Sequence, residues 1–175
     1  MKVNKRGQFY FIGALVVILV LISFAVLNNT SNKKENPELK NIQEELDLEI
    51  GKTLEYIANN GLSENEAQDL FKNFSLNYMN KIGYNKNIIF MFGQKQGSLI
   101  LKGYKLEDSE NITIVSGSST EIISAGEFEE TIATSGNNIS LTSGESVYMF
   151  DLFEGQNFYY FITKEYKGEK QIIKG

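Results

Sequence analysis

The sequence predicts an α+β protein: an N-terminal transmembrane helix, then an αα-hairpin, then an antiparallel β-sheet or sandwich. Three observations predict this order. Residues 9–27 form one apolar run of nineteen residues without a charge. Apolar residues at helical spacing follow, and from residue 86 the pattern changes to short apolar or alternating segments separated by Gly and Ser turns. With 175 residues, the chain has room for one domain after the apolar run.

The apolar run matches the thickness of a membrane, because about 20 residues at about 1.5 Å each cross a hydrocarbon core of about 30 Å. Three basic residues and no acid precede it, whereas 22 acidic residues and 14 lysines follow it, a formal charge of −8. This bias favours a cytoplasmic N-terminus in the cell membrane. We expect a basic cytoplasmic leader (1–8), a transmembrane helix in the lipid bilayer (9–27), a linker (28–37) and an extracytoplasmic remainder.

The junction before the run carries a recognisable motif. Lys5 and Arg6 form a basic pair, Gly7 follows, and Gln8 leads straight into the apolar residues. Over about the first thirty residues, the chain resembles archaeal type IV pilin-like precursors, which carry a class III signal peptide. The resemblance implies recognition of the basic pair and cleavage of the Gly7–Gln8 bond by a prepilin-type peptidase, with the helix kept for a filament core. Where many such pilins carry an assembly-promoting glutamate, at the fifth mature position, this chain has Ile12.

Two other fates of the N-terminus stay open on the residues alone. An uncleaved run would be a plain anchor. A secretory signal peptide would be cut after the small-x-small triplet that ends at Ala25. The run is longer than the roughly 7–15 apolar residues of an ordinary signal peptide, which argues against that second fate.

A helical hairpin is predicted over 38–83. Pro37 suits the first turn of a helix, Gly61 suits a left-handed C-terminal stop, and Ser63 with Glu66 forms a capping-box pattern. One apolar stripe consists of Leu39, Ile42, Leu46, Ile50, Leu54 and Ile57. We expect the stripe to pack on the downstream strands; the alternative is a stalk or coiled coil that faces a partner.

The β-rich region is predicted over 86–175. Segment 88–92 is apolar on both faces, as a covered central strand would be, and Gly97 indicates a hairpin into 99–106. Further strands are expected at 111–115, 121–124, 128–133, 147–153, 158–163 and 171–173. We expect exposed turns at 116–120 and 135–138, a hairpin loop at 154–157 and a turn at Lys167–Gly168.

Composition excludes several kinds of chemistry. The chain has no Cys and no His, so disulfides, thiolate or imidazole metal sites and His-based catalysis are absent. Two carboxylate groups, Glu107, Asp108 and Glu110, and Glu127, Glu129 and Glu130, have no evident partner that would raise a pKa for acid–base catalysis. No nucleophile-elbow, phosphate-loop or dinucleotide motif occurs. We therefore predict no enzyme, no cofactor, no metal site and, from the acidic balance, no nucleic-acid partner.

The remaining site candidates are glycosylation sequons, of which Asn111 and Asn138 are the accessible ones in an exported domain. The favoured function is a membrane-anchored, pilin-like surface protein with a structural, assembly or adhesion role. Such a protein would associate with itself in a filament or with other membrane subunits. The alternative is an unprocessed, single-pass anchored binding module for a protein or glycan.

Overall fold

The computed structural model describes residues 36–175, which begin with two helices, α2 (Pro37–Asn60) and α3 (Glu64–Ile82). The Asn36 side chain caps α2 by accepting a hydrogen bond from the Glu38 backbone N–H at 3.0 Å. Gly61 ends α2 with φ of 58°, a left-handed conformation that glycine adopts without strain. The Ser63–Glu66 capping box opens α3. Pro37 in the first turn, Gly61 and the capping box confirm the predicted start and stop signals, whereas the Asn36 cap was not predicted.

Nine strands follow within the described residues. They are β1 (Asn87–Gln94), β2 (Gly97–Lys105), β3 (Ile112–Ser116), β4 (Ser119–Ile123), β5 (Gly126–Thr134), β6 (Asn138–Ser143), β7 (Ser146–Asp151), β8 (Gln156–Tyr166) and β9 (Glu169–Lys174). All pairings are antiparallel, and they form a five-stranded sheet in the order β5-β2-β1-β8-β9 and a four-stranded sheet in the order β4-β3-β6-β7.

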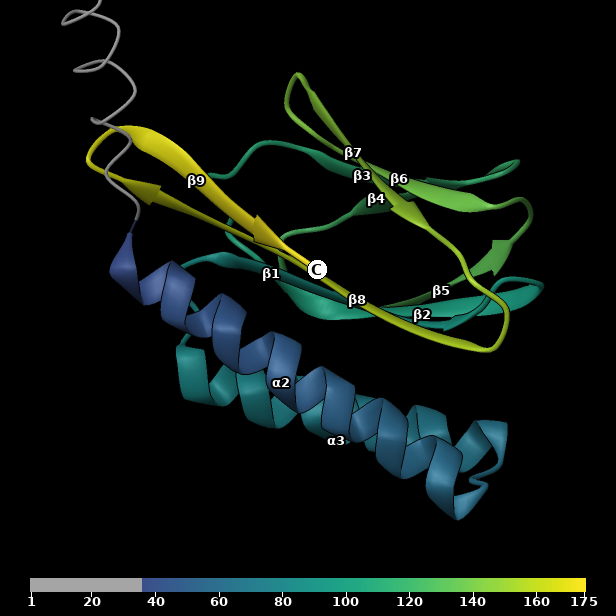
Figure 1. The fold of residues 1–175 in the computed structure, drawn as a ribbon. Helices are drawn as coiled ribbons and strands as arrows, with labels where there is room; N and C mark the ends of the chain where they lie inside the picture. The colour runs from purple at the N-terminus through teal and green to yellow at the C-terminus, as the bar shows by residue number, and fades with distance from the viewer. Residues whose placement is uncertain (1–35) are drawn as a thin grey trace, which may run out of the picture. The chain divides into compact units, whose positions relative to one another are not determined.

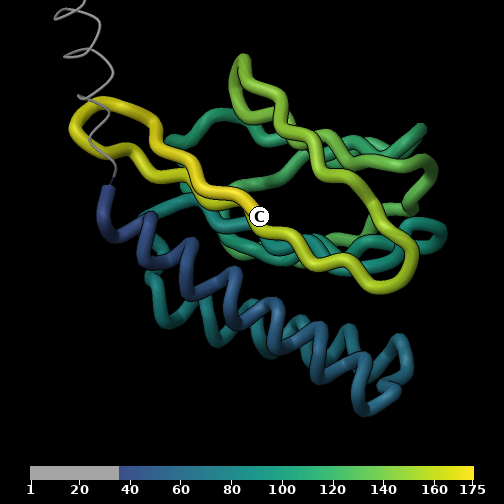
Figure 2. The backbone as a smooth tube through the Cα atoms, viewed as in Figure 1, coloured from purple at the N-terminus to yellow at the C-terminus, as the bar shows by residue number. Residues whose placement is uncertain are grey.

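The elements of residues 36–175 form three layers (Figure 1). The two helices lie side by side against one face of the five-stranded sheet, and the four-stranded sheet covers the opposite face (Figures 1 and 2). The α+β class and the antiparallel strands are therefore confirmed, and the strands form two packed sheets. The predicted transmembrane helix, 9–27, lies outside the described residues. Between residues 36 and 175, neither helix has the combination of length and apolar character needed to cross a bilayer.

The central strand β1 divides the interior into two hydrophobic cores. Its side chains alternate, so Ile88, Phe90 and Phe92 face the helices whereas Ile89 and Met91 face the four-stranded sheet. All five are fully buried. This burial confirms the covered central strand that the uninterrupted apolar segment 88–92 predicted.

The first core, between the helices and the sheet, is rich in aromatic rings. Phe71 of α3 stacks on Phe92 with ring centroids 5.1 Å apart and meets the edge of Phe158 at the same distance. Five members of the α2 stripe are buried in this core: Leu39, Ile42, Leu46, Ile50 and Ile57. The stripe therefore packs on the sheet, as expected, instead of facing a coiled-coil partner.

Two lysine–glutamate–lysine clusters join the helices to the sheet. Glu38 of α2 contacts Lys164 of β8 at 2.6 Å and the fully buried Lys86 at 3.2 Å. Hydrogen bonding from Lys164 is the main cause that lowers the pKa of Glu38, with Lys86 adding to it.

The second cluster centres on Glu129 of β5, a member of one predicted carboxylate group. It contacts Lys102 of β2 at 2.8 Å and Lys72 of α3 at 2.6 Å. Hydrogen bonds from Lys102 and then Lys72 lower the pKa of Glu129. This glutamate therefore has partners that the sequence did not indicate, and they hold it ionised.

Two details of the strand prediction were wrong. The loop after residue 153 is no hairpin, because β7 belongs to the four-stranded sheet and β8 to the five-stranded one. Asn157 holds this crossing: its side chain accepts from the Phe153 N–H at 2.9 Å and donates to the Phe153 carbonyl at 3.0 Å. In addition, β6 was not predicted, since only Ile139 and Leu141 are apolar in a strand otherwise made of Asn, Ser and Thr.

Candidate functional site

The residues predicted for processing, Lys5, Arg6, Gly7 and Gln8, lie outside the described residues. The two sequon asparagines are both described and both exposed. Asn138 is the first residue of β6, and Asn111 directly precedes β3. Since β3 and β6 pair antiparallel, with Ile112 opposite Ser143, the two asparagines stand at opposite ends of the four-stranded sheet.

The face of this sheet that points away from the five-stranded sheet carries no charge over its centre. The strand register places eight residues there in two rows across all four strands. We call them the outer face: the first row is Ile122, Thr113, Thr142 and Val147, and the second is Thr120, Val115, Ser140 and Met149. Four of the side chains are apolar and four carry a hydroxyl.

Large apolar side chains of the outer face are open to solvent. Ile122 is 64% exposed, Val147 60% and Met149 48%. On the reverse side of the same strands, Ile114, Ile139 and Leu141 are fully buried in the second core. The three exposed side chains lie on the two edge strands, β4 and β7, with three of the hydroxyl side chains and Val115 between them, and exposed apolar side chains on one face are a feature of interaction sites.

The free edge of β7, beside the outer face, is closed by a lysine from the other sheet. The Lys174 ammonium donates to the Met149 carbonyl at 3.3 Å and lies 5.2 Å from the centre of the Phe150 ring. A lysine on an edge strand discourages pairing with a further strand. A partner is therefore better accommodated on the face of the four-stranded sheet than along the β7 edge.

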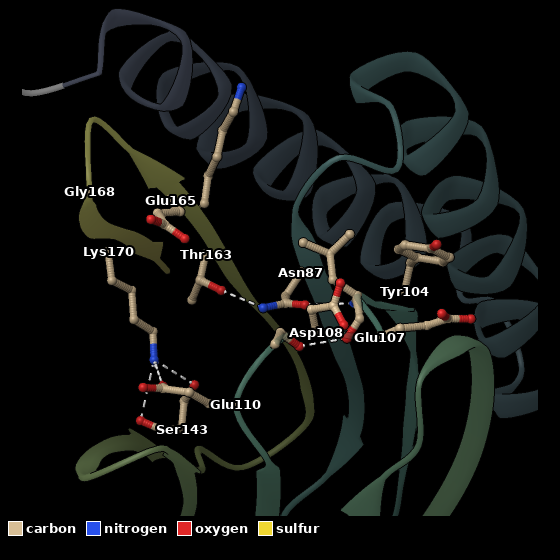
Figure 3. Close-up of a pocket in the computed structure, with 13 residues that line it drawn as sticks. Asn87, Tyr104, Glu107, Asp108, Glu110, Ser143, Thr163, Glu165, Gly168 and Lys170 are labelled. Atoms are coloured by element: carbon tan, nitrogen blue, oxygen red, sulfur yellow. Dashed lines mark hydrogen bonds and ion pairs between the residues drawn. The ribbon is translucent and has the colours of Figure 1, made fainter.

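A second candidate is an open hollow of about 580 Å³ with charged residues in its lining (Figure 3). It lies between the turn that joins β2 to β3 and the β8–β9 hairpin. Lys164 and Lys170 line it together with the carboxylates of Glu107, Asp108, Glu110 and Glu165. Buried Asn87 shapes its floor: its amide donates to Thr163 Oγ1 at 2.9 Å and its oxygen accepts from the Leu106 N–H at 2.8 Å.

The hollow's two ammonium groups are already neutralised. Lys170 pairs with Glu110 and donates to Ser143 Oγ at 2.9 Å (Figure 3), and Lys164 pairs with Glu38. The surplus of carboxylates makes the hollow acidic, so it disfavours phosphate and other anions and favours cationic or hydroxyl-bearing groups. Six charged residues line it, whereas most small-molecule pockets carry only a small number of polar groups.

The fold places the two predicted carboxylate groups at separate sites. Glu107, Asp108 and Glu110 lie on the exposed turn at the hollow, as expected, whereas Glu127 and Glu130 are exposed on β5 beside the paired Glu129. Among residues 36–175, no three acidic side chains converge as metal ligands would. Comparison of the chain with protein-family models, curated proteins and solved structures found no match in any of the three.

The outer face was missed by sequence reasoning because its signal is weak. Thr113 lies in the predicted strand 111–115, but Ser140 and Thr142 lie in a segment for which no strand was predicted, and the register places the three beside one another. The sequence signal that predicts β6 is the alternation of apolar and polar residues in Ile139-Ser140-Leu141-Thr142, which is typical of a strand with one buried face.

Proposed function

We propose that this chain is a single-pass membrane protein of the pilin-like kind that holds residues 36–175 outside the cytoplasm as a surface module. Its role is structural: assembly or adhesion, without catalysis. Cleavage between Gly7 and Gln8, next to the basic pair Lys5 and Arg6, precedes that role.

One observation carries the proposal: the uncharged run 9–27, with basic residues only before it and an acidic body after it. Residues 36–175 contain 21 acidic residues and 12 lysines, a formal charge of −9. Each apolar side chain such as Leu or Ile near the bilayer centre contributes about 0.3–0.6 kcal/mol to insertion, so the run favours the membrane strongly. Basic residues kept on the cytoplasmic side orient the chain.

The structure of residues 36–175 supports a surface role in a further way. Two packed cores and two ion-pair clusters stabilise the body, which contains no disulfide because the chain has no cysteine. The outer face, by contrast, contributes exposed apolar area that the body does not need for its own packing. A module of this kind can present a surface to neighbouring subunits.

The deciding experiment is intact mass spectrometry of the chain extracted from native membranes. We expect a mature protein that begins at Gln8. A chain that still begins at Met1 would remove the processing step, and a chain that begins at Val26 would identify a cleaved signal peptide. The same spectra test the sequons, because a glycan on Asn111 or Asn138 adds its mass to that of the whole chain.

The acidic hollow favours a second candidate: an unprocessed, anchored binding module. Its carboxylates could accept hydrogen bonds from a glycan or contact a basic segment of a protein. This candidate predicts an intact N-terminus, a monomer or small oligomer in detergent, and no filaments by electron microscopy.

A further inference from the structure

The outer face differs from the rest of the described surface in charge. The body, residues 36–175, carries a formal charge of −9, and acidic residues occur on both helices, on β5 and on the turns. Two copies of such a body repel one another wherever charged surfaces meet. The eight residues of the outer face carry no charge, so two copies can approach there without a like-charge contact.

The side chains of the outer face are suited to pairing with a copy of themselves. Threonine and serine hydroxyls both donate and accept, so Thr113, Ser140 and Thr142 can find partners among the same groups of a second copy. Val147 and Ile122 supply apolar contact at the two sides of the sheet. A two-fold contact of this kind presents the same patch from each copy and closes after two.

The direction of contact is also restricted. Lys174 closes the β7 edge by donating to the Met149 carbonyl, and Asp151 marks one end of the sheet in the row of Asn138. Face-to-face packing, with sheets about 10 Å apart, remains open.

The size of the outer face indicates whether the contact can form in solution or only between copies anchored in a membrane. Four strands about 4.8 Å apart and two rows of side chains give a footprint on the order of 300 Å². Stable complexes in solution bury about 800 Å² on each partner, so this face alone is too small to hold free copies together. Anchoring in one membrane raises the effective concentration of the copies, and a weak contact then suffices.

We propose that the outer face is a self-association surface, on which a second membrane-anchored copy of this chain packs face to face. The proposal rests on the membrane anchoring proposed above. Self-association occurs in the plane of the membrane and is lost when the anchored copies are diluted apart.

The absence of cysteine from the chain allows a direct test. Single variants Thr142→Cys and Ser140→Cys place a thiol at the centre of the outer face of the full chain. Leu48→Cys is the matched control, since Leu48 is 57% exposed on α2, on the opposite side of the body. Native membranes are treated with a short bismaleimide and the chain is detected by blotting.

We expect cross-linked dimers from either outer-face variant, about tenfold more than from the control, because a contact between tethered copies keeps the two cysteines at a higher effective concentration than random collision does. Adding Val147→Lys to Thr142→Cys should lower the dimer yield about tenfold, since a lysine ammonium would then lose its water against an uncharged surface.

Three outcomes would overturn the inference, and they separate it from the proposed function. Equal cross-linking of Leu48→Cys would indicate collision alone. Membrane-bound chains with no cross-link at either outer-face cysteine would exclude the contact and leave the anchoring intact. A full-length chain recovered outside the membrane fraction would overturn the anchoring proposal and this inference together.

Discussion

The two sheets of this protein differ in what covers them. The five-stranded sheet is enclosed, with helices on one face and the second sheet on the other, and its central strand β1 is fully buried from Ile88 to Phe92. The four-stranded sheet is covered on its inner side alone. Its outer face exposes Ile122, Val147 and Met149 among Ser and Thr side chains.

This difference indicates that the side chains that stabilise the fold and the side chains available to a partner lie on different sheet faces. Side chains on the enclosed sheet contribute to two cores, so their loss disrupts the fold. Side chains on the outer face contribute little to the body's own packing, so they can vary or serve a partner at small cost in stability. The predictions below test this separation by chemical unfolding of the full chain in detergent, followed by circular dichroism and tyrosine fluorescence.

The largest effect is expected from Phe71→Ala in the core between helices and sheet. Phe71 is fully buried and contacts the rings of Phe92 and Phe158 at 5.1 Å each. Its removal should lower the free energy of unfolding by about 3–5 kcal/mol, the usual cost of a buried Phe. A loss below about 1 kcal/mol would mean that the helices are not packed on the sheet as described.

A substitution on each side of the four-stranded sheet sharpens the comparison. Leu141→Ala, on the buried inner side, should lower the free energy of unfolding by about 3 kcal/mol. Val147→Ala, 60% exposed on the outer face, should change it by less than about 0.5 kcal/mol. Similar losses from both variants would contradict the assignment of an inner and an outer side.

A smaller effect is expected where α2 meets β8. The Tyr160 hydroxyl donates to Asp47 Oδ1 at 2.6 Å. Burial, followed by the hydrogen bond to Asp47, raises the pKa of Tyr160, so the hydroxyl stays protonated and continues to donate at neutral pH. Tyr160→Phe should cost about 1 kcal/mol. Asp47→Asn, which retains an acceptor, is the matched control and should cost less.

The smallest effect concerns pH. The pKa values of Glu38 and Glu129 are lowered by their lysine partners, so each pair stabilises the folded chain while the glutamate is ionised. That stability is present above the ordinary pKa of 4.5 and is lost as the pH falls through the lowered values. More than a third of each glutamate side chain is exposed to solvent, which screens the charges, so each pair contributes about 1 kcal/mol or less.

Acid should therefore loosen the helix layer before the four-stranded sheet. Hydrogen exchange followed by mass spectrometry, at a series of acidic pH values, measures this order. Glu129→Gln should remove part of the pH dependence around α3. Loosening that begins instead in β6 and β7 would contradict the role of the two clusters.

The sequence predicted what short-range patterns determine. Pro37 in the first turn of α2, the cap at Ser63, the left-handed Gly61 and the β8–β9 turn at Lys167–Gly168 depend on neighbouring residues alone, and each is present. The buried α2 stripe and the covered strand β1 also follow from apolar spacing.

The features that the sequence analysis did not predict depend on contacts between residues far apart in the chain. The pairing of β7 with β6, and of β8 with β1, is set by which face each strand buries, and no local signal separates this crossing from a hairpin. The partners of Glu129, Lys102 and Lys72, lie on two other elements. The outer face exists only once four strands are aligned, so no single segment reveals it.

The most direct test of the account uses the Leu48→Cys variant of the full chain, with its cysteine outside the proposed contact, in intact cells of its source. A membrane-impermeant maleimide should label this cysteine before lysis, and the labelled chain should remain in membranes washed with carbonate. This result is predicted by an anchor at residues 9–27 and an extracytoplasmic body. Labelling only after lysis, or a freely soluble chain that still contains residues 9–27, would contradict it.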